Sequence, residues 1–313
     1  MGEGMICRRP VTTYSIVARD GTGALGVGVQ SHWFNVGAVV PWVEAGVGAV
    51  AVQSICDPSS GTKALDLMRS GVGAVAALER LLEGDEQAAY RQIAIVDADG
   101  VVATHTGHLC IAEAGHAVGD GFSAQANLMD RETVWSAIAE AFAHAEGDLA
   151  ERLLTALEAA ETEGGDVRGR QSTALVVVPS PRHDGPAFDL RVEDAPDPLG
   201  ELRRLVSLQR AYVQLNHGDA MMAAGDLDAA LAAYEAATQI VPDSATDGEA
   251  AFWTGVAFAG NGRVDQAVPY LARAAAFGQR WKKLLPRLVR SEMFPDNDAL
   301  LSRALDAVSL EEP

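Results

Sequence analysis

The character of the sequence changes near residue 195, and this change constrains the fold more than any other feature. Upstream, short β-branched segments alternate with glycine-rich turns and helical patterns. Downstream, the strand signals stop and only helical patterns remain. The sequence therefore predicts two domains, one over residues 11–195 that combines sheets with helices and one over residues 196–313 that is helical.

The order of the segments predicts how the first domain is layered. Strands are expected over residues 12–18, 25–30, 47–53, 91–96, 101–105, 173–178 and 187–192, and helices over 62–70, 74–83, 132–145 and 149–161. Strands thus alternate with pairs of helices. This order is typical of an α+β domain in which sheets pack face to face between helical layers.

A pattern of small residues repeats in the second domain. Gly218, Gly225, Ala230, Tyr234 and Ala237 are followed 37 residues later by Gly255, Gly262, Ala267, Leu271 and Ala274. The pattern resembles the tetratricopeptide (TPR) repeat, whose usual period is about 34 residues, and it predicts small residues where paired helices touch. Because two repeats are few for independent stability, we expect them to dock on the first domain or on a second copy of the chain, as a homo-oligomer. The repeats could also bind a protein partner.

Charge and composition exclude several classes of protein. Lys and Arg number 24 against 43 Asp and Glu, and the resulting net charge of −19 repels phosphate backbones and anionic lipid, so no nucleic-acid partner is expected. The start of the given sequence has no apolar core, and its longest apolar stretch is interrupted by polar residues, so neither a secretory signal nor a membrane-spanning segment is expected. Cys7, Cys56 and Cys110 follow no disulfide spacing, so free thiols and a cytoplasmic location are expected.

The first expected strand begins with hydroxyl residues, including Thr12, Thr13 and Ser15. Threonine on a strand is usually a β-former without a chemical role. A hydroxyl residue that becomes the first residue of a chain has another use, because its α-amine, with a pKa of about 7.7–8.0, can take the proton of its own hydroxyl. The residues alone leave both interpretations open.

Seven motifs are spread over residues 11 to about 195. They are Thr13-Tyr-Ser-Ile-Val-Ala-Arg-Asp20, Leu25-Gly-Val-Gly-Val-Gln-Ser31, Val40-Pro-Trp42, Ala45-Gly-Val-Gly-Ala-Val-Ala51, Arg91-Gln92, His105-Thr-Gly107 and Gly169-Arg-Gln-Ser172. Their order and spacing resemble the bacterial domain-of-unknown-function family 1028. The family is similar to N-terminal nucleophile (Ntn) hydrolases, so the resemblance implies a four-layer αββα sandwich, followed here by a helical region.

The resemblance also implies a reaction, the hydrolysis of a C–N bond in a small amide, lactam or acylated amino compound. Thr13 would be the nucleophile, and no cofactor or metal is expected. Twelve residues precede Thr13 in this sequence, so its α-amine becomes free only when the Thr12–Thr13 bond is cut. The alternative is a non-catalytic Ntn-fold module for binding or assembly.

Three further polar residues are candidates for the site. Ser31 and Gln30 end the second expected strand beside the start of the first, where Ser31 could position the nucleophile and Gln30 could contact the substrate; both are also ordinary polar strand ends. Asn127 follows an expected strand and carries a side-chain amide that could donate to an oxyanion, or serve as turn or helix-start chemistry.

His105 and Arg170 are the remaining candidates, both for contact with the substrate. A metal site of His105, His108 and Cys110 is disfavoured because the strand period does not place all three on one face, and His105 could also be a surface residue. Arg170 could bind an anionic group or pair at the surface. The only lysine before residue 196 is Lys63, so an arginine (Arg19, Arg91 or Arg170) would have to supply positive charge near Thr13.

Overall fold

The structure is a computed structural model that describes residues 9–182, 185 and 187–308. The chain divides into two compact units, which we call the sandwich unit (up to Val206) and the helical unit (from Ser207). The division falls inside helix α5 (Pro198–Ala223).

Two antiparallel sheets form the centre of the sandwich unit. The six-stranded sheet has the order β10 (Phe188–Val192), β9 (Ser172–Val178), β2 (Leu25–Ser31), β1 (Tyr14–Arg19), β8 (Phe122–Ala126) and β7 (Gly115–Gly119). The four-stranded sheet has the order β3 (Pro41–Glu44), β4 (Gly48–Ser54), β5 (Arg91–Asp97) and β6 (Val102–Thr106). Short 3-10 helices lie at Val36–Ala38 and Ala88–Tyr90.

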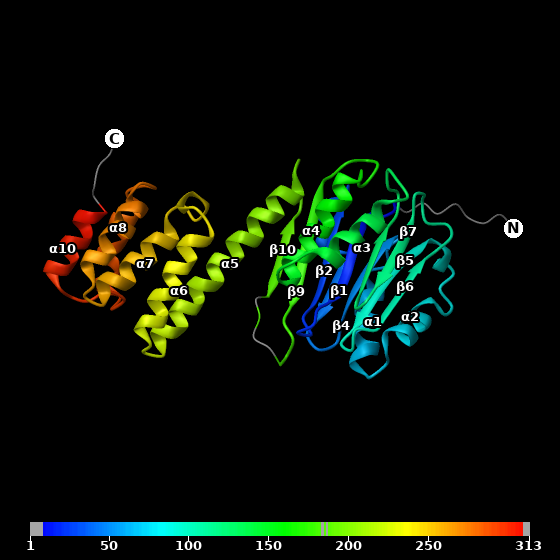
Figure 1. Cartoon of the computed structure of the whole chain (residues 1–313), viewed down its shortest axis with the longest axis horizontal. Helices are drawn as coiled ribbons and strands as arrows, with labels where there is room; N and C mark the ends of the chain where they lie inside the picture. Colours follow the sequence, from blue (N-terminus) through cyan, green and yellow to red (C-terminus); the bar gives the residue numbers. More distant parts are fainter. Residues whose placement is uncertain (1–8, 183–184, 186, 309–313) are drawn as a thin grey trace. The chain divides into compact units, whose positions relative to one another are not determined.

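Helices cover the outer face of each sheet (Figure 1). The helices on the six-stranded sheet are α3 (Val134–His144) and α4 (Leu149–Thr162), and those on the four-stranded sheet are α1 (Ser59–Arg69) and α2 (Ala74–Leu82). The unit therefore has four layers in the order αββα, which confirms the α+β fold expected from the sequence.

The period-two alternation of strand side chains decides which residues lie between the sheets. On β1, Tyr14 and Ile16 pack into the core beneath α3 and α4, whereas Val17 packs into the core between the sheets. The residues two and four positions before Val17 are Ser15 and Thr13, so their side chains are placed on the inter-sheet side as well. Both are fully buried.

The edge strands β3 and β7 were not expected from the sequence. Each has only four or five residues, and each lies at the margin of its sheet. Their burial is intermediate to exposed, so they lack the continuous apolar signal that marks the central strands.

The helical unit continues from α5 with α6 (Leu227–Ile240), α7 (Glu249–Gly260), α8 (Val264–Ala275), α9 (Arg280–Arg290), α10 (Asp298–Ala307) and a 3-10 helix at Asp243–Ala245. Of the repeated glycines, Gly218 and Gly255 lie where these helices touch, whereas Gly225 and Gly262 have positive φ angles of 81° and 76° in the turns. A Cβ on Gly218 would come within 2.7 Å of the ring of Tyr234, and one on Gly255 within 2.7 Å of Leu271. The contact that the sequence pattern predicts thus occurs twice, at positions 37 residues apart.

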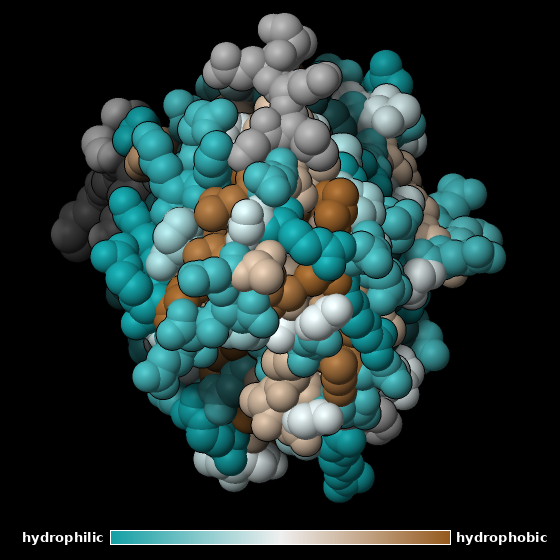
Figure 2. Space-filling view, turned by 90° about the vertical axis from the view of Figure 1, so that its left-hand side faces the viewer, coloured by the Kyte–Doolittle hydropathy of each residue, from teal (hydrophilic) through white to brown (hydrophobic). Residues whose placement is uncertain are grey.

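Helix α10 packs its small residues Ala304 and Ala307 inward, against α8 and α9. Its outward positions include Ser302, Arg303 and Asp306. Figure 2 shows the side of the helical unit that carries α10, where hydrophilic residues dominate and hydrophobic ones gather in small areas between them. Within the described ranges, no helix has the length and apolar character needed to cross a bilayer.

Candidate active site

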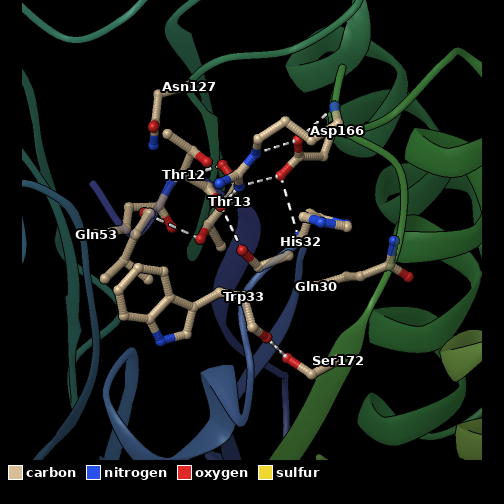
Figure 3. A network of polar contacts seen from close by, with 12 residues as sticks. Thr12, Thr13, Gln30, His32, Trp33, Gln53, Asn127, Asp166 and Ser172 are labelled. Atoms are coloured by element: carbon tan, nitrogen blue, oxygen red, sulfur yellow. Dashed lines mark hydrogen bonds and ion pairs between the residues drawn. The ribbon is translucent and has the colours of Figure 1, made fainter. Parts of the chain in front are cut away.

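The chain crosses from one sheet to the other at residues 11–13. Val11 exchanges two backbone hydrogen bonds with Ser54 at the end of β4, with N–O distances of 2.8 and 2.9 Å. Three residues later, Tyr14 begins β1 in the six-stranded sheet. Thr12 and Thr13 therefore span the gap between the sheets, and both are fully buried (Figure 3).

Two side chains donate hydrogen bonds to the carbonyl oxygen of Thr12. One is the hydroxyl of Ser31, the last residue of β2. The other is Nη2 of Arg168, at 3.1 Å. The carbonyl that precedes Thr13 is thus held by a hydroxyl and a guanidinium, the kind of donors that stabilise negative charge on an oxygen.

Asp166 holds Arg168 in this position. Its two carboxylate oxygens accept from Nε of Arg168 at 3.0 Å and from Nη2 at 2.7 Å. The Asp166 side chain is 0% exposed, and it also accepts from the backbone N–H of His32 at 3.2 Å. This two-point ion pair with a buried carboxylate fixes the planar guanidinium, whose side chain is 30% exposed, so Arg168 is oriented before any ligand binds.

Thr13 is held at its carbonyl and at its hydroxyl. Its hydroxyl donates to the carbonyl of Val11 at 3.1 Å. Its own carbonyl accepts from Nε2 of Gln53 at 3.2 Å and from the backbone N–H of Asn127 at 3.1 Å. Figure 3 shows Thr12 and Thr13 between Gln53 on one side and Asp166 on the other.

Behind Thr13, a network of buried amides ties the two sheets together, and Gln92 on β5 is its centre. Oε1 of Gln92 accepts from Gln53 at 2.7 Å and from Nδ2 of Asn127 at 2.8 Å. Nε2 of Gln92 donates to Ala126 O at 2.9 Å, to Thr106 Oγ1 at 2.9 Å and to Gly115 O at 3.1 Å. Asn127 Oδ1 is buried and has no hydrogen-bond partner among the described residues.

Gln30 lies on the opposite face of β2 from Ser31 and points away from Thr13 (Figure 3). Its Nε2 donates to Glu161 on α4 at 2.7 Å, and the Tyr14 hydroxyl donates to the same oxygen at 2.7 Å. Burial raises the pKa of Tyr14 well above its usual value, and the neighbouring Glu161 raises it further. Arg170 pairs with the other oxygen of Glu161 at 3.1 Å.

Among the described residues, His105 makes no hydrogen bond or ion pair with Thr13 or with its hydrogen-bond partners. Its Nε2 lies 2.8 Å from the carbonyl oxygen of Ala88. On β6, His105 pairs with Ile93 of β5, which packs against α1 and α2. The neighbouring Thr106 does face the amide network, through Gln92.

The structure thus brings together three of the six predicted residues, Thr13, Ser31 and Asn127. Gln30 and Arg170 form a second cluster around Glu161, and the substrate contacts assigned to them and to His105 stay predictions.

Sequence reasoning missed Arg168 and Asp166. The other charged candidates have different partners: Arg19 donates to Ala98 O, Arg91 pairs with Asp85, and Lys63 is exposed on α1. The position of Arg168 in the chain could have identified it as a candidate. Its loop leads directly into β9, the strand on which Ser172 pairs with Ser31.

Among the described residues, no group of three or more His, Cys, Asp or Glu side chains could hold a metal ion. Cys56 and Cys110 are free thiols, and burial raises the pKa of Cys56 to about 12 and also raises that of Cys110. Cys7 lies outside the described residues.

Comparison with known proteins identifies the class to which this sandwich and its threonine belong. Residues 13–202 match the model of a family of unknown function, DUF1028, and the chain is a member of that family. It is similar to the crystal structure of protein SPO2555 from Silicibacter pomeroyi, also of DUF1028, with 31% identity and a TM-score of 0.58 over 62% of this chain and 84% of that one. No curated protein matches.

Proposed function

We propose that the sandwich unit is an Ntn-type amidohydrolase that cleaves a C–N bond of a small amide, lactam or acylated amino compound. Thr13 acts as the nucleophile after the preceding residues are removed. One observation carries the proposal: the carbonyl immediately before Thr13 is bound by Ser31 and by Arg168, deep between the sheets.

The same donors suit removal of the leader by the chain itself. Attack of Thr13 Oγ1 on the carbonyl carbon of Thr12 would place negative charge on the oxygen that Ser31 and Arg168 hold. The C–N bond then breaks, the hydroxyl proton passes to the departing nitrogen, and Thr12 remains as an ester on Thr13. Water hydrolyses this ester to a Thr12 carboxylate and a Thr13 with a free hydroxyl and a free amine.

In the shortened chain, the free α-amine of Thr13 takes the proton of its hydroxyl as the hydroxyl attacks the substrate carbonyl. We assign the oxyanion site to Ser31 and Arg168, since they bind the carbonyl that occupies this place in the uncleaved chain. Nδ2 of Asn127, the sequence candidate for this role, donates to Gln92. Through its backbone N–H, Asn127 instead positions Thr13.

Intact-mass measurement of the purified chain tests the first step. We expect the wild type to lose residues 1–12, Thr13→Ala to keep them, and Thr13→Ser to lose them. Arg168→Met should slow the cleavage by about 100-fold, the usual effect of losing one oxyanion donor. Arg170→Met is the matched control, because it removes a neighbouring arginine that contacts Glu161 instead. Equal cleavage in Thr13→Ala and wild type would contradict the proposal.

Turnover needs a separate test. A shortened chain in which removal of the initiator Met leaves Thr13 first should hydrolyse members of a panel of acylated amino-acid p-nitroanilides, and the same chain with Ala at position 13 should not. Full activity in molecules that keep residues 1–12 would show that the α-amine of Thr13 is not the base.

A second candidate function is a non-catalytic binding or assembly module, and the groove of the helical unit described next is the observation that favours it. On this view, the chain keeps residues 1–12, and Thr13→Ala leaves ligand binding by the helical unit unchanged.

A further inference from the structure

The helical unit contains a groove with a volume of about 820 Å³. Its lining comes from the second half of α5, from α6 and α7, and from the connection between α9 and α10. Leu215, Trp253 and Val256 contribute apolar surface to it. A groove of this size with apolar walls has the dimensions and the lining of a ligand-binding site.

Four carboxylates also line the groove, and they come from three separate parts of the chain. Asp219 lies on α5, Glu249 begins α7, and Glu292 and Asp296 lie in the α9–α10 connection. None of the described lining residues is Lys, Arg or His, and within the described ranges none of the four carboxylates is in an ion pair. The groove therefore carries negative charge that no neighbouring side chain neutralises.

Two tyrosines orient two of these carboxylates. Tyr234 donates to Asp219 at 2.5 Å, and Tyr212 donates to Glu249 at 2.5 Å. Burial raises the pKa of Tyr212 to about 12, with a further contribution from Glu249, and burial likewise raises that of Tyr234. Both hydroxyls thus stay protonated at neutral pH, and each occupies one oxygen of its partner, leaving the second oxygen available for another donor.

We propose that this groove binds a short basic peptide segment of a partner protein, in which Lys or Arg residues alternate with apolar ones. The apolar side chains would pack on Trp253 and its neighbours, and the cations would reach the carboxylates. Among the described residues, no three carboxylates converge closely enough to hold a single metal ion. One ammonium group therefore cannot serve all four carboxylates of the groove, whereas several basic side chains on one peptide can. This binding site does not depend on the reaction proposed for Thr13.

Fluorescence anisotropy of the full chain tests the proposal, with a labelled octapeptide that alternates leucine and arginine as the probe. We expect saturable binding that weakens as salt is raised. The double variant Glu292→Gln, Asp296→Asn should weaken it about tenfold, since it removes two exposed charge contacts of up to about 1 kcal/mol each at the edge of the groove. Both residues are exposed and make no described side-chain hydrogen bond, so the fold should be unaffected.

The matched control is Glu132→Gln with Asp306→Asn, which makes the same two kinds of change at exposed positions outside the groove. We expect it to bind as the wild type does. Equal weakening in both double variants would show only general attraction to an acidic protein and would overturn the proposal. Equal affinity for a leucine–glutamate peptide, no binding at millimolar peptide, or binding of hexane-1,6-diamine as tight as that of the peptide would also overturn it.

Discussion

Replacing Gln92 by methionine should strongly destabilise the sandwich unit while nearly preserving side-chain volume. Gln92 makes five described hydrogen bonds, and it joins β5 to groups on the opposite sheet. Methionine removes all five. Nδ2 of Asn127 is then left without its acceptor, in a side chain whose Oδ1 already has no described partner.

A buried polar group left without a partner costs about 1–3 kcal/mol. Gln53 keeps its bond to Thr13 O, and Thr106 keeps His116, so the largest losses are at Asn127 and at the carbonyls of Ala126 and Gly115. Counting in full the loss at Asn127 and the loss at one of the two carbonyls, at about 1.5 kcal/mol each, gives about 3 kcal/mol. For a unit of this size, that corresponds to a fall in Tm of about 6–12 °C.

Thermal and urea unfolding measure this change, and exposed Gln266 on α8, replaced by methionine, is the control with no expected effect. Asn127→Ala combined with Gln92→Met should cost about 1 kcal/mol less than the sum of the single variants, because both remove the same bond. A Gln92→Met variant within 1 kcal/mol of the wild type, or a fully additive pair, would refute the view that this network holds the sheets together.

Three other substitutions probe packing and charge. Gly61→Ala would place a Cβ 2.2 Å from the ring of Trp42, so it should cost about 1–3 kcal/mol by thermal unfolding, whereas at Gly73 the nearest atom would be 3.7 Å away and alanine should be neutral. Gly255→Ala should separate α7 from α8 and likewise lower Tm. The pKa of Tyr14 is higher in the folded chain than in the unfolded chain. The stability that this difference contributes is complete below about pH 10 and declines as the pH rises further, because the unfolded chain ionises first. Tyr14→Phe should lessen this decline in unfolding measurements at pH 8–11.

The layers and the helical pairs could be predicted because they depend on periodicity. Along β1 and β2, side chains alternate between the two faces of the sheet. Val17 and Ile16 therefore lie on opposite faces, as do Ser31 and Gln30. Gly218 and Gly255 mark close helix contacts because a larger residue would clash with Tyr234 or Leu271. The α+β fold and the family are confirmed, whereas the reaction and the roles of the site residues remain proposals.

The hydrogen-bond and ion-pair partners of the site residues could not be predicted, because they depend on contacts between segments far apart in the sequence. Arg168 and Arg170 lie in the same loop, but they point to different partners, Thr12 and Glu161. Nothing in their local sequence distinguishes them until the position of α4 is known. Gln92 is similar, since its role depends on strands that follow it by more than twenty residues.

The passage of the chain between the sheets at Val11 and Thr12 has a consequence for any enzyme made from it. If the bond before Thr13 is cut, the released segment is still joined to β4 by the two bonds between Val11 and Ser54. The space beside Thr13 becomes vacant only when those bonds break as well. On the proposed reaction, the departing Val11 and Thr12 leave a space of their own size, and we expect this space to limit the acyl group that the mature site accepts.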